Sequence, residues 1–253
     1  MLERIIAIHF SPTGGTRRAA LLLAGGIAKQ VEEIDLTLPQ VQEKSFGPQD
    51  VVLVAGPVYG GRLPALMAER LRRLTGGGAR AVSAAVYGGR AYEDALVELD
   101  DLLEAQGFAV AAAAALLAEH SIVRKLAAGR PDAQDEAQLA AFGARIAEKL
   151  SRGEKNAPQT PGNRPYRDWA GMPVTPAAGE ACTGCGTCAK SCPAQAIDPA
   201  DPRQTDAARC ITCMRCVAVC PAQARVLPAQ VQGMLGQKLA PFMEKRPENE
   251  LYL

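Results

Sequence analysis

Cysteine is absent from the first 181 residues of the chain, and all eight cysteines lie between positions 182 and 220. The chain also lacks an apolar run of the roughly 18 residues needed to cross a bilayer, since the longest, 108–118, ends at Glu119. Neither sign of charge is in excess, and the formal net charge is +1. No basic stripe with interleaved aromatic residues is present. The sequence therefore predicts neither a membrane span nor a nucleic-acid partner.

The cysteines form two runs with the same spacing, C-x2-C-x2-C-x3-C-P. This spacing is typical of bacterial two-cluster ferredoxins, in which three cysteines of a run ligate one cluster and the fourth reaches the other. We therefore predict two [4Fe-4S] clusters, whose ligands cross over between the runs. One cluster is expected to take Cys182, Cys185, Cys188 and Cys220. The other is expected to take Cys210, Cys213, Cys216 and Cys192.

Two other uses of cysteine fit this pattern less well. A disulfide framework suits a small secreted domain, whereas this chain is long and begins without a signal-peptide pattern. Structural zinc sites use paired C-x2-C halves rather than triplets with a fourth cysteine before proline. We therefore expect iron–sulfur chemistry in a reducing compartment, and a cytoplasmic protein.

A second motif follows the first predicted strand, 4–10, and precedes a helical pattern over about 16–30. A strand, a loop of small residues and a helix start together present backbone N–H groups to a phosphate. The loop is neither a Walker loop nor a dinucleotide fingerprint, and its alternative is an ordinary β–α turn. It resembles the FMN-phosphate loop of the flavodoxins. The predicted phosphate contacts are Ser11, Thr13, Gly14, Gly15 and Thr16.

Apolar runs alternate with helical patterns through the first 152 residues. Further strands are predicted at 31–36, 51–55, 81–87 and 108–117, and helices at 64–74, 92–106 and 132–150. Propensity alone favours a helix for the all-alanine stretch 111–115, but Gly107 and the need for a strand before the last helix favour a strand. The alternation predicts an α/β fold, a flavodoxin-like doubly wound five-stranded parallel sheet, followed by a small α+β 2[4Fe-4S] ferredoxin domain.

Two loops at the predicted carboxyl edge of this sheet carry three of the five tyrosines. In a flavodoxin-like domain these loops would hold the isoalloxazine ring, with glycines allowing close backbone approach and a tyrosine stacking on the ring. The alternative for each tyrosine is ordinary half-buried packing. His120 follows the fifth strand but has no visible partner, and His9 is expected to be a core residue. The predicted ring contacts are Pro57, Val58, Tyr59, Gly60, Gly61, Tyr87, Gly88, Gly89, Arg90 and Tyr92.

Composition divides the chain into four parts. These are a flavodoxin-like FMN-binding domain (1–152), a Pro-rich linker (153–178), a ferredoxin domain (179–228) and a C-terminal extension (229–253). The linker contains Tyr166 and Trp169, so part of it is expected to pack between the domains. The extension ends on apolar residues and is expected to dock onto the protein or a partner.

Taken whole, the chain resembles the EFR1-family flavodoxin–ferredoxin fusions. The resemblance rests on the segments 11–16, 56–64, 86–96 and 118–132 and on the two cysteine runs. It implies an FMN-binding domain and two [4Fe-4S] clusters in one polypeptide. Flavodoxins and ferredoxins tend to be acidic, whereas this chain is neutral, so docking to a basic partner by charge steering is in doubt.

The favoured hypothesis is electron transfer between FMN and the clusters, with redox partner proteins that the sequence does not identify. One alternative is a flavin-site reductase of a small substrate, with a crevice lined by Arg62, Arg90, Tyr92 and His120. Another is a docking module that binds no flavin. A flavin edge covered by protein would favour simple electron transfer.

Overall fold

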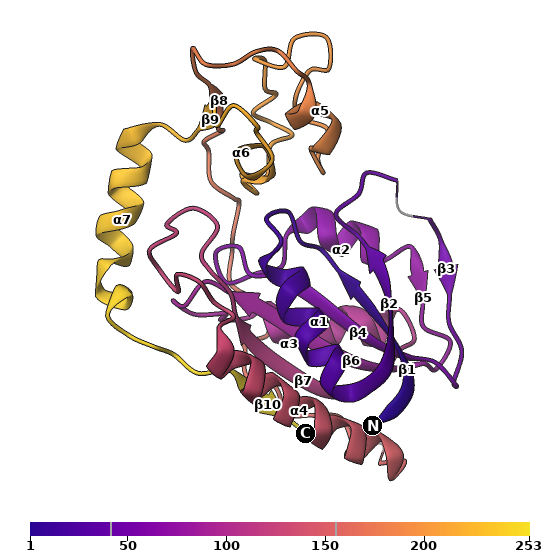
Figure 1. The fold of residues 1–253 in the computed structure, drawn as a ribbon. Helices are drawn as coiled ribbons and strands as arrows, with labels where there is room; N and C mark the ends of the chain where they lie inside the picture. The colour runs from indigo at the N-terminus through magenta and orange to yellow at the C-terminus, as the bar shows by residue number, and fades with distance from the viewer. Residues whose placement is uncertain (41, 155) are drawn as a thin grey trace.

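The computed structural model describes residues 1–40, 42–154 and 156–253 (Figure 1). Residue 155 of the predicted linker lies outside the described residues. The main sheet contains β1 (Leu2–His9), β2 (Ala28–Asp35), β4 (Val51–Pro57), β6 (Arg80–Tyr87), β7 (Ala109–Leu117) and β10 (Glu250–Tyr252). Two small pairs of strands are β3 (Lys44–Ser45) with β5 (Leu74–Thr75), and β8 (Ala177–Ala178) with β9 (Arg225–Val226). The helices are α1 (Gly15–Ile27), α2 (Ala65–Leu71), α3 (Ala95–Ala105), α4 (Ala133–Ser151), α5 (Thr187–Ser191), α6 (Arg215–Ala218) and α7 (Ala229–Met243).

The main sheet has the order β10-β7-β6-β4-β1-β2. All its strands except β10 run parallel, and their order from β2 to β7 is the flavodoxin-like 2-1-3-4-5 arrangement. The predicted fold class is therefore confirmed. The sheet differs from the prediction by its sixth strand, β10, which pairs antiparallel with β7. Only three residues form β10, so its hydrophobic pattern is too short to predict a strand.

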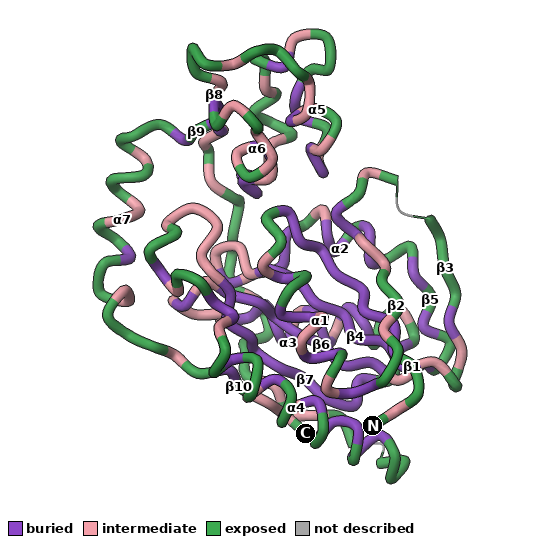
Figure 2. The backbone as a smooth tube through the Cα atoms, viewed as in Figure 1, coloured by how far each residue is buried: buried purple, intermediate pink, exposed green. Residues whose placement is uncertain are grey.

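Helices cover both faces of the sheet. One face packs against α1 and α4, and the other against α2 and α3, giving two apolar cores (Figure 2). The alanines of β7 face both cores, with Ala112 and Ala114 in one and Ala113 in the other. A strand buried on both faces needs apolar side chains along its whole length, and this burial overrides the helical propensity of alanine here. The predicted strand at 108–117 is therefore confirmed.

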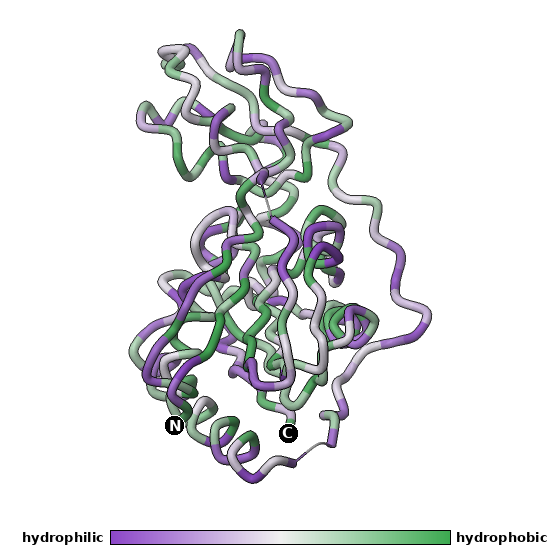
Figure 3. Tube along the Cα trace, turned by 90° about the vertical axis from the view of Figure 1, so that its right-hand side faces the viewer, coloured by the Kyte–Doolittle hydropathy of each residue, from purple (hydrophilic) through white to green (hydrophobic). Residues whose placement is uncertain are grey.

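The remaining segments connect the sheet to the cysteine-rich part of the chain. The linker runs along one side of the molecule from the end of α4 and is mostly hydrophilic (Figure 3). Helix α7 runs along another side and leads from β9 back to β10 at the sheet edge (Figure 1). Among the described residues, no helix combines the length and apolarity that a bilayer crossing requires.

Helices α1 and α4 cross in backbone contact because each carries a glycine at the crossing. A Cβ atom on Gly143 would lie 2.5 Å from the carbonyl carbon of Gly26. A Cβ atom on Gly26 would in turn lie 3.0 Å from the carbonyl oxygen of Ala140. Any side chain at this crossing must push the helices apart.

We expect Gly143→Ala to lower the free energy of unfolding by about 1–3 kcal/mol, the usual cost of overpacking. Gly25→Ala is the matched control, because a Cβ atom there meets no heavy atom within 4 Å. This control should be neutral or stabilising by up to about 1 kcal/mol, since alanine favours a helix interior over glycine. Chemical denaturation of both variants is the measurement, and equal effects would contradict the close crossing.

Candidate functional site

The loops after four parallel strands meet in one cavity at the carboxyl edge of the sheet. These loops follow β1, β4, β6 and β7, and parallel strands place all their carboxyl ends at one edge. The lining residues are Pro12, Thr13, Gly15, Thr16, Pro57, Val58, Tyr59, Val86, Tyr87, Gly88, Ala118, Glu119, His120 and Ser121. We call this the edge cavity.

The predicted phosphate loop forms one wall of the edge cavity. Gly14 has φ +93°, a left-handed conformation that glycine adopts without a Cβ clash. The Ser11 hydroxyl accepts a hydrogen bond of 2.9 Å from the Arg17 amide and so closes the loop onto α1. Ser11 and Gly14 therefore shape the loop, whereas Thr13, Gly15 and Thr16 line the cavity. The first amides of a helix have no partner within it and suit an anion.

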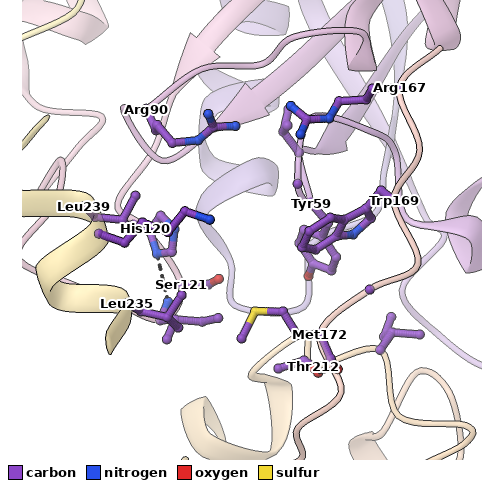
Figure 4. Close-up of a pocket in the computed structure, with 16 residues that line it drawn as sticks. Tyr59, Arg90, His120, Ser121, Arg167, Trp169, Met172, Thr212, Leu235 and Leu239 are labelled. Carbon is purple, nitrogen blue, oxygen red and sulfur yellow. Dashed lines mark hydrogen bonds between the residues drawn. The ribbon is translucent and has the colours of Figure 1, made fainter. Parts of the chain in front are cut away.

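A larger cavity of about 230 Å³ continues from the edge cavity. We call it the ring cavity. It shares Val58, Tyr59, His120 and Ser121 with its neighbour. Figure 4 shows Arg90 and Arg167 at one end and Met172 and Thr212 at the other. The remaining lining residues are Gly60, Ile122, Trp169, Gly171, Ile211, Leu235, Lys238 and Leu239.

The walls of the ring cavity come from segments far apart in the sequence. The flavodoxin-like part supplies the residues between 58 and 122, and the linker supplies those between 167 and 172. Ile211 and Thr212 belong to the second cysteine run, and Leu235, Lys238 and Leu239 belong to α7. The linker therefore packs at this cavity through Trp169, which lies against Gly60.

Not every predicted ring contact lines a cavity. Pro57, Val58, Tyr59, Gly60, Tyr87, Gly88 and Arg90 line one or both. Gly61 and Gly89 line neither, and their φ values of +89° and +88° indicate turn-forming roles.

Tyr92, another predicted ring contact, also lines neither cavity. Its hydroxyl lies 2.7 Å from the Tyr252 hydroxyl and donates to Glu250, and its ring packs edge-on against Tyr87. Tyr92 thus holds β10 to the sheet rather than facing the ring site. Sequence patterns could not show this, since its partners lie about 160 positions away along the chain.

Tyr59 lines both cavities and is the best placed of the tyrosines predicted to stack. Burial raises the pKa of its hydroxyl well above the ordinary value, and the nearby Cys213 adds to this. Tyr59 therefore stays neutral and protonated at physiological pH. Its closeness to Cys213 also relates the ring cavity to the cysteine-rich part.

His120 lines both cavities, and its hydrogen bonds define its tautomer. Its Nδ1 atom accepts from the backbone amides of Ile122 and Val123, at 3.2 Å and 3.0 Å. The ring proton is therefore on Nε2. Burial, assisted by the positive charge of Arg90, lowers the pKa of His120 below its ordinary value of 6.5. Sequence analysis found no partner for His120 because both partners are backbone amides of its own turn.

The eight cysteines line two further cavities, with one set of four in each. The first contains Cys182, Cys185, Cys188 and Cys220, and the second contains Cys192, Cys210, Cys213 and Cys216. Each set takes three cysteines from one run and one from the other. Among the described residues, no three His, Cys, Asp or Glu side chains are grouped around a position for a single metal ion.

The fourth cysteine of each run occupies the same local environment. Cys192 Sγ accepts a hydrogen bond of 3.4 Å from the Ala196 amide, and Cys220 Sγ accepts one of 3.3 Å from the Ala224 amide. Hydrogen bonds to sulfur tune the potential of an iron–sulfur cluster. The two sets differ in burial. Cys185 is exposed, with a pKa lowered by a hydrogen bond to Thr187, whereas burial raises the pKa of Cys213 to about 12.

Comparisons with known proteins agree with this division of the chain. Residues 181–225 match the family model described as a 4Fe-4S dicluster domain. None of the curated proteins compared with the chain matches it. A flavodoxin from the domain Archaea is similar in structure at 17% identity, with a TM-score of 0.42, over 58% of this chain and 99% of that chain. Oxidised flavodoxin 1 from Bacillus cereus is similar at 19% identity and a TM-score of 0.41, over 58% and 98%.

Part of a larger protein is also similar in structure. Rubredoxin oxygen:oxidoreductase from Desulfovibrio gigas is similar at 16% identity and a TM-score of 0.40, over 59% of this chain and 36% of that chain. By its strand order and its matched domain, the chain has a flavodoxin-like α/β fold followed by a 4Fe-4S dicluster domain. Membership of the EFR1 family stays a prediction.

We expect acidification to cost stability through His120. Because its folded pKa is lowered, the unfolded chain binds the proton first as pH falls, so the contribution of His120 is complete above pH 6.5 and is lost below it. His120→Asn keeps an acceptor near the amides of Ile122 and Val123 but cannot titrate. Denaturation midpoints measured from about pH 7.5 to about pH 5 should fall more for the wild type than for this variant. Equal slopes would contradict the lowered pKa.

Proposed function

We propose that this protein transfers electrons between FMN, bound at the carboxyl edge of the sheet, and two [4Fe-4S] clusters, bound by the eight cysteines. One observation carries the proposal. The ring cavity is closed by Ile211 and Thr212, two residues of the second cysteine run. Ile211 also lines the cavity of Cys192, Cys210, Cys213 and Cys216. The proposed flavin site and one proposed cluster site thus share a wall.

The residues at the carboxyl edge fit FMN by the chemistry that they offer. Thr13, Gly15 and Thr16 would hold the phosphate with hydroxyl and amide donors. Tyr59 and Trp169 offer aromatic surface to a planar ring, and His120 offers an N–H donor. Bound FMN exchanges electrons in pairs or singly, whereas an iron–sulfur cluster carries one at a time.

The charge around the ring cavity favours an electron-rich ligand. Arg90, Arg167 and Lys238 line it, and Glu93 pairs with both arginines. Three positive side chains against one carboxylate leave a net positive environment. Such an environment stabilises negative charge on a reduced ring.

The cysteine sets fit the two clusters through crossed ligation. Arg225 supports this part of the chain from within, because its buried guanidinium donates to the carbonyl oxygens of Pro176 and Pro202 and to the Thr205 hydroxyl. The thiols in the second set are mostly buried, so cluster binding must supply the positive charge that keeps them ionised.

Other segments of the chain cover the ring cavity, which favours electron transfer over reduction of a small substrate. Of the four residues expected in a substrate crevice, only Arg90 and His120 line it. Arg62 pairs instead with Glu98, at 2.7 Å. The linker, the second cysteine run and α7 occupy the remaining walls.

Anaerobic purification with iron, sulfide and flavin analysis tests this function. We expect about eight irons, about eight sulfides and one FMN per chain, as two cubane clusters and one mononucleotide require. Flavin-free protein with intact clusters would favour a docking module instead. Two zinc ions per chain would contradict the cluster assignment.

Crossed ligation predicts which cluster each fourth cysteine supports. Cys192→Ala should remove or damage the cluster of Cys210, Cys213 and Cys216, and leave the other cluster intact. Cys220→Ala is the matched variant and should have the opposite effect. Iron content should fall by up to half in each, and EPR of the reduced proteins should show different remaining signals. If Cys192→Ala removed the cluster of its own run, the crossed assignment would be wrong.

A further inference from the structure

The two cysteine runs have the same spacing but different residues between their cysteines. In the first run the residues between the first three cysteines are Thr183, Gly184, Gly186 and Thr187. At the matching positions the second run has Ile211, Thr212, Met214 and Arg215. The cysteine spacing that cluster binding needs does not explain why the side chains between the cysteines are small in the first run and bulky in the second.

The backbone conformation at these positions is the same in both runs, although the residues differ. Gly184 and Gly186 have φ of +71° and +73°, where glycine is unstrained. Thr212 and Met214 adopt the same left-handed region, with φ of +50° and +63°. That region is unfavourable for a residue with a Cβ atom, and most of all for a β-branched one. Residues held there point to a role for their side chains.

The side chains of the second run contact the rest of the protein. Thr212 Oγ1 donates to the Val174 carbonyl at 2.7 Å, and Thr212 lines the ring cavity. Arg215 donates to the Pro12 carbonyl, in the phosphate loop, at 3.0 Å. Ile211 lies between the ring cavity and the second set of cysteines. Arg215 therefore fixes this run to the flavodoxin-like part, and Thr212 fixes it to the linker.

The loop that carries the first three cysteines of the first run faces away from that part. Its cavity is lined only by residues between 182 and 225, with none from the sheet, the linker or α7. Thr183, Gly184 and Cys185 are exposed. Pro221 and Gln223, which follow Cys220, are exposed as well. We call these five residues the outer face. Apart from Cys185, a predicted cluster ligand, none of them has an ionisable side chain.

We propose that the clusters form an ordered relay. The cluster of Cys192, Cys210, Cys213 and Cys216 exchanges electrons with the flavin, and the cluster of Cys182, Cys185, Cys188 and Cys220 exchanges them with a one-electron carrier protein at the outer face. The inference rests on the proposed function and adds the order of the steps. In each step one electron leaves a donor, which is oxidised, and enters an acceptor, which is reduced. No bond forms or breaks, and the proton that a reduced flavin releases on full oxidation passes to water.

A loop exchange tests the inner step. Replacing Ile211, Thr212, Met214 and Arg215 by their first-run counterparts keeps all cysteines and places glycine at both left-handed positions. This variant should keep the full iron content, but transfer from photoreduced flavin to the clusters should slow several-fold. Hydrogen exchange in 12–16 and 210–216 should also increase, because the contacts to Pro12 and Val174 are lost. The control, Ala207→Arg, changes an exposed residue that lines neither cysteine cavity, and it should change neither measurement.

Cytochrome c, added as a one-electron acceptor, tests the outer step. Thr183→Trp covers the outer face and should slow cytochrome c reduction several-fold while leaving internal transfer unchanged. Ala207→Trp is the control, since Ala207 is exposed and lines neither cysteine cavity.

The outcomes separate the order from the function. An exchange variant that transfers electrons from flavin to the clusters at the wild-type rate would overturn the order and leave the proposed function intact. Faster or equal cytochrome c reduction by Thr183→Trp would overturn the outer step. A wild-type protein that binds FMN and both clusters but shows no internal transfer would overturn the proposed function and the relay together.

Discussion

The structure depends on the contacts that hold the cysteine-rich part to the linker and to the carboxyl edge of the sheet. Those contacts use few side chains, and each donates to a backbone carbonyl on the opposite surface. Arg215 donates to Pro12, Thr212 donates to Val174, and Arg70 of α2 donates to Pro193. Carbonyl acceptors define distance and direction without a complementary charge. A neutral chain can therefore hold its two parts in register without strong attraction between them.

Such sparse contacts are sufficient because the chain connects the two parts twice. The linker joins α4 to the cysteine-rich part, and α7 returns from it to β10. The return is fixed by Asn249, whose side chain accepts from the Leu117 amide and donates to Asp135. Covalent connection raises the effective concentration of one surface at the other, so a small interface remains formed. The same return places Leu235 and Leu239 of α7 at the ring cavity.

Sequence reasoning predicted the parts of the molecule that are determined by local pattern. The alternation of strands and helices was sufficient for the parallel sheet, and the cysteine spacing was sufficient for the dicluster domain. It gave no sign of the hydrogen-bond partners of Tyr92, because these belong to a strand of three residues at the far end of the chain. It led us to expect that the linker and the C-terminal extension pack onto the protein, but not that they line the ring cavity, since contacts between remote segments leave no periodic signal. The tautomer of His120 could not be predicted either, because it depends on backbone amides, which any residue supplies.

The residues between the cysteines contain a further signal, which is visible in the sequence alone. The two cysteine runs differ where a cluster-binding loop needs only small residues, and the second run keeps Thr212 and Met214 at positions where the first has glycine. If cluster assembly were the only demand, glycine would relieve the strained backbone at no cost to ligation. The strain is retained where the side chains reach a second surface and is absent where the run faces solvent. In a chain with two copies of one motif, the positions that the copies share therefore indicate the cofactor. The positions at which they differ indicate which copy packs against the rest of the protein.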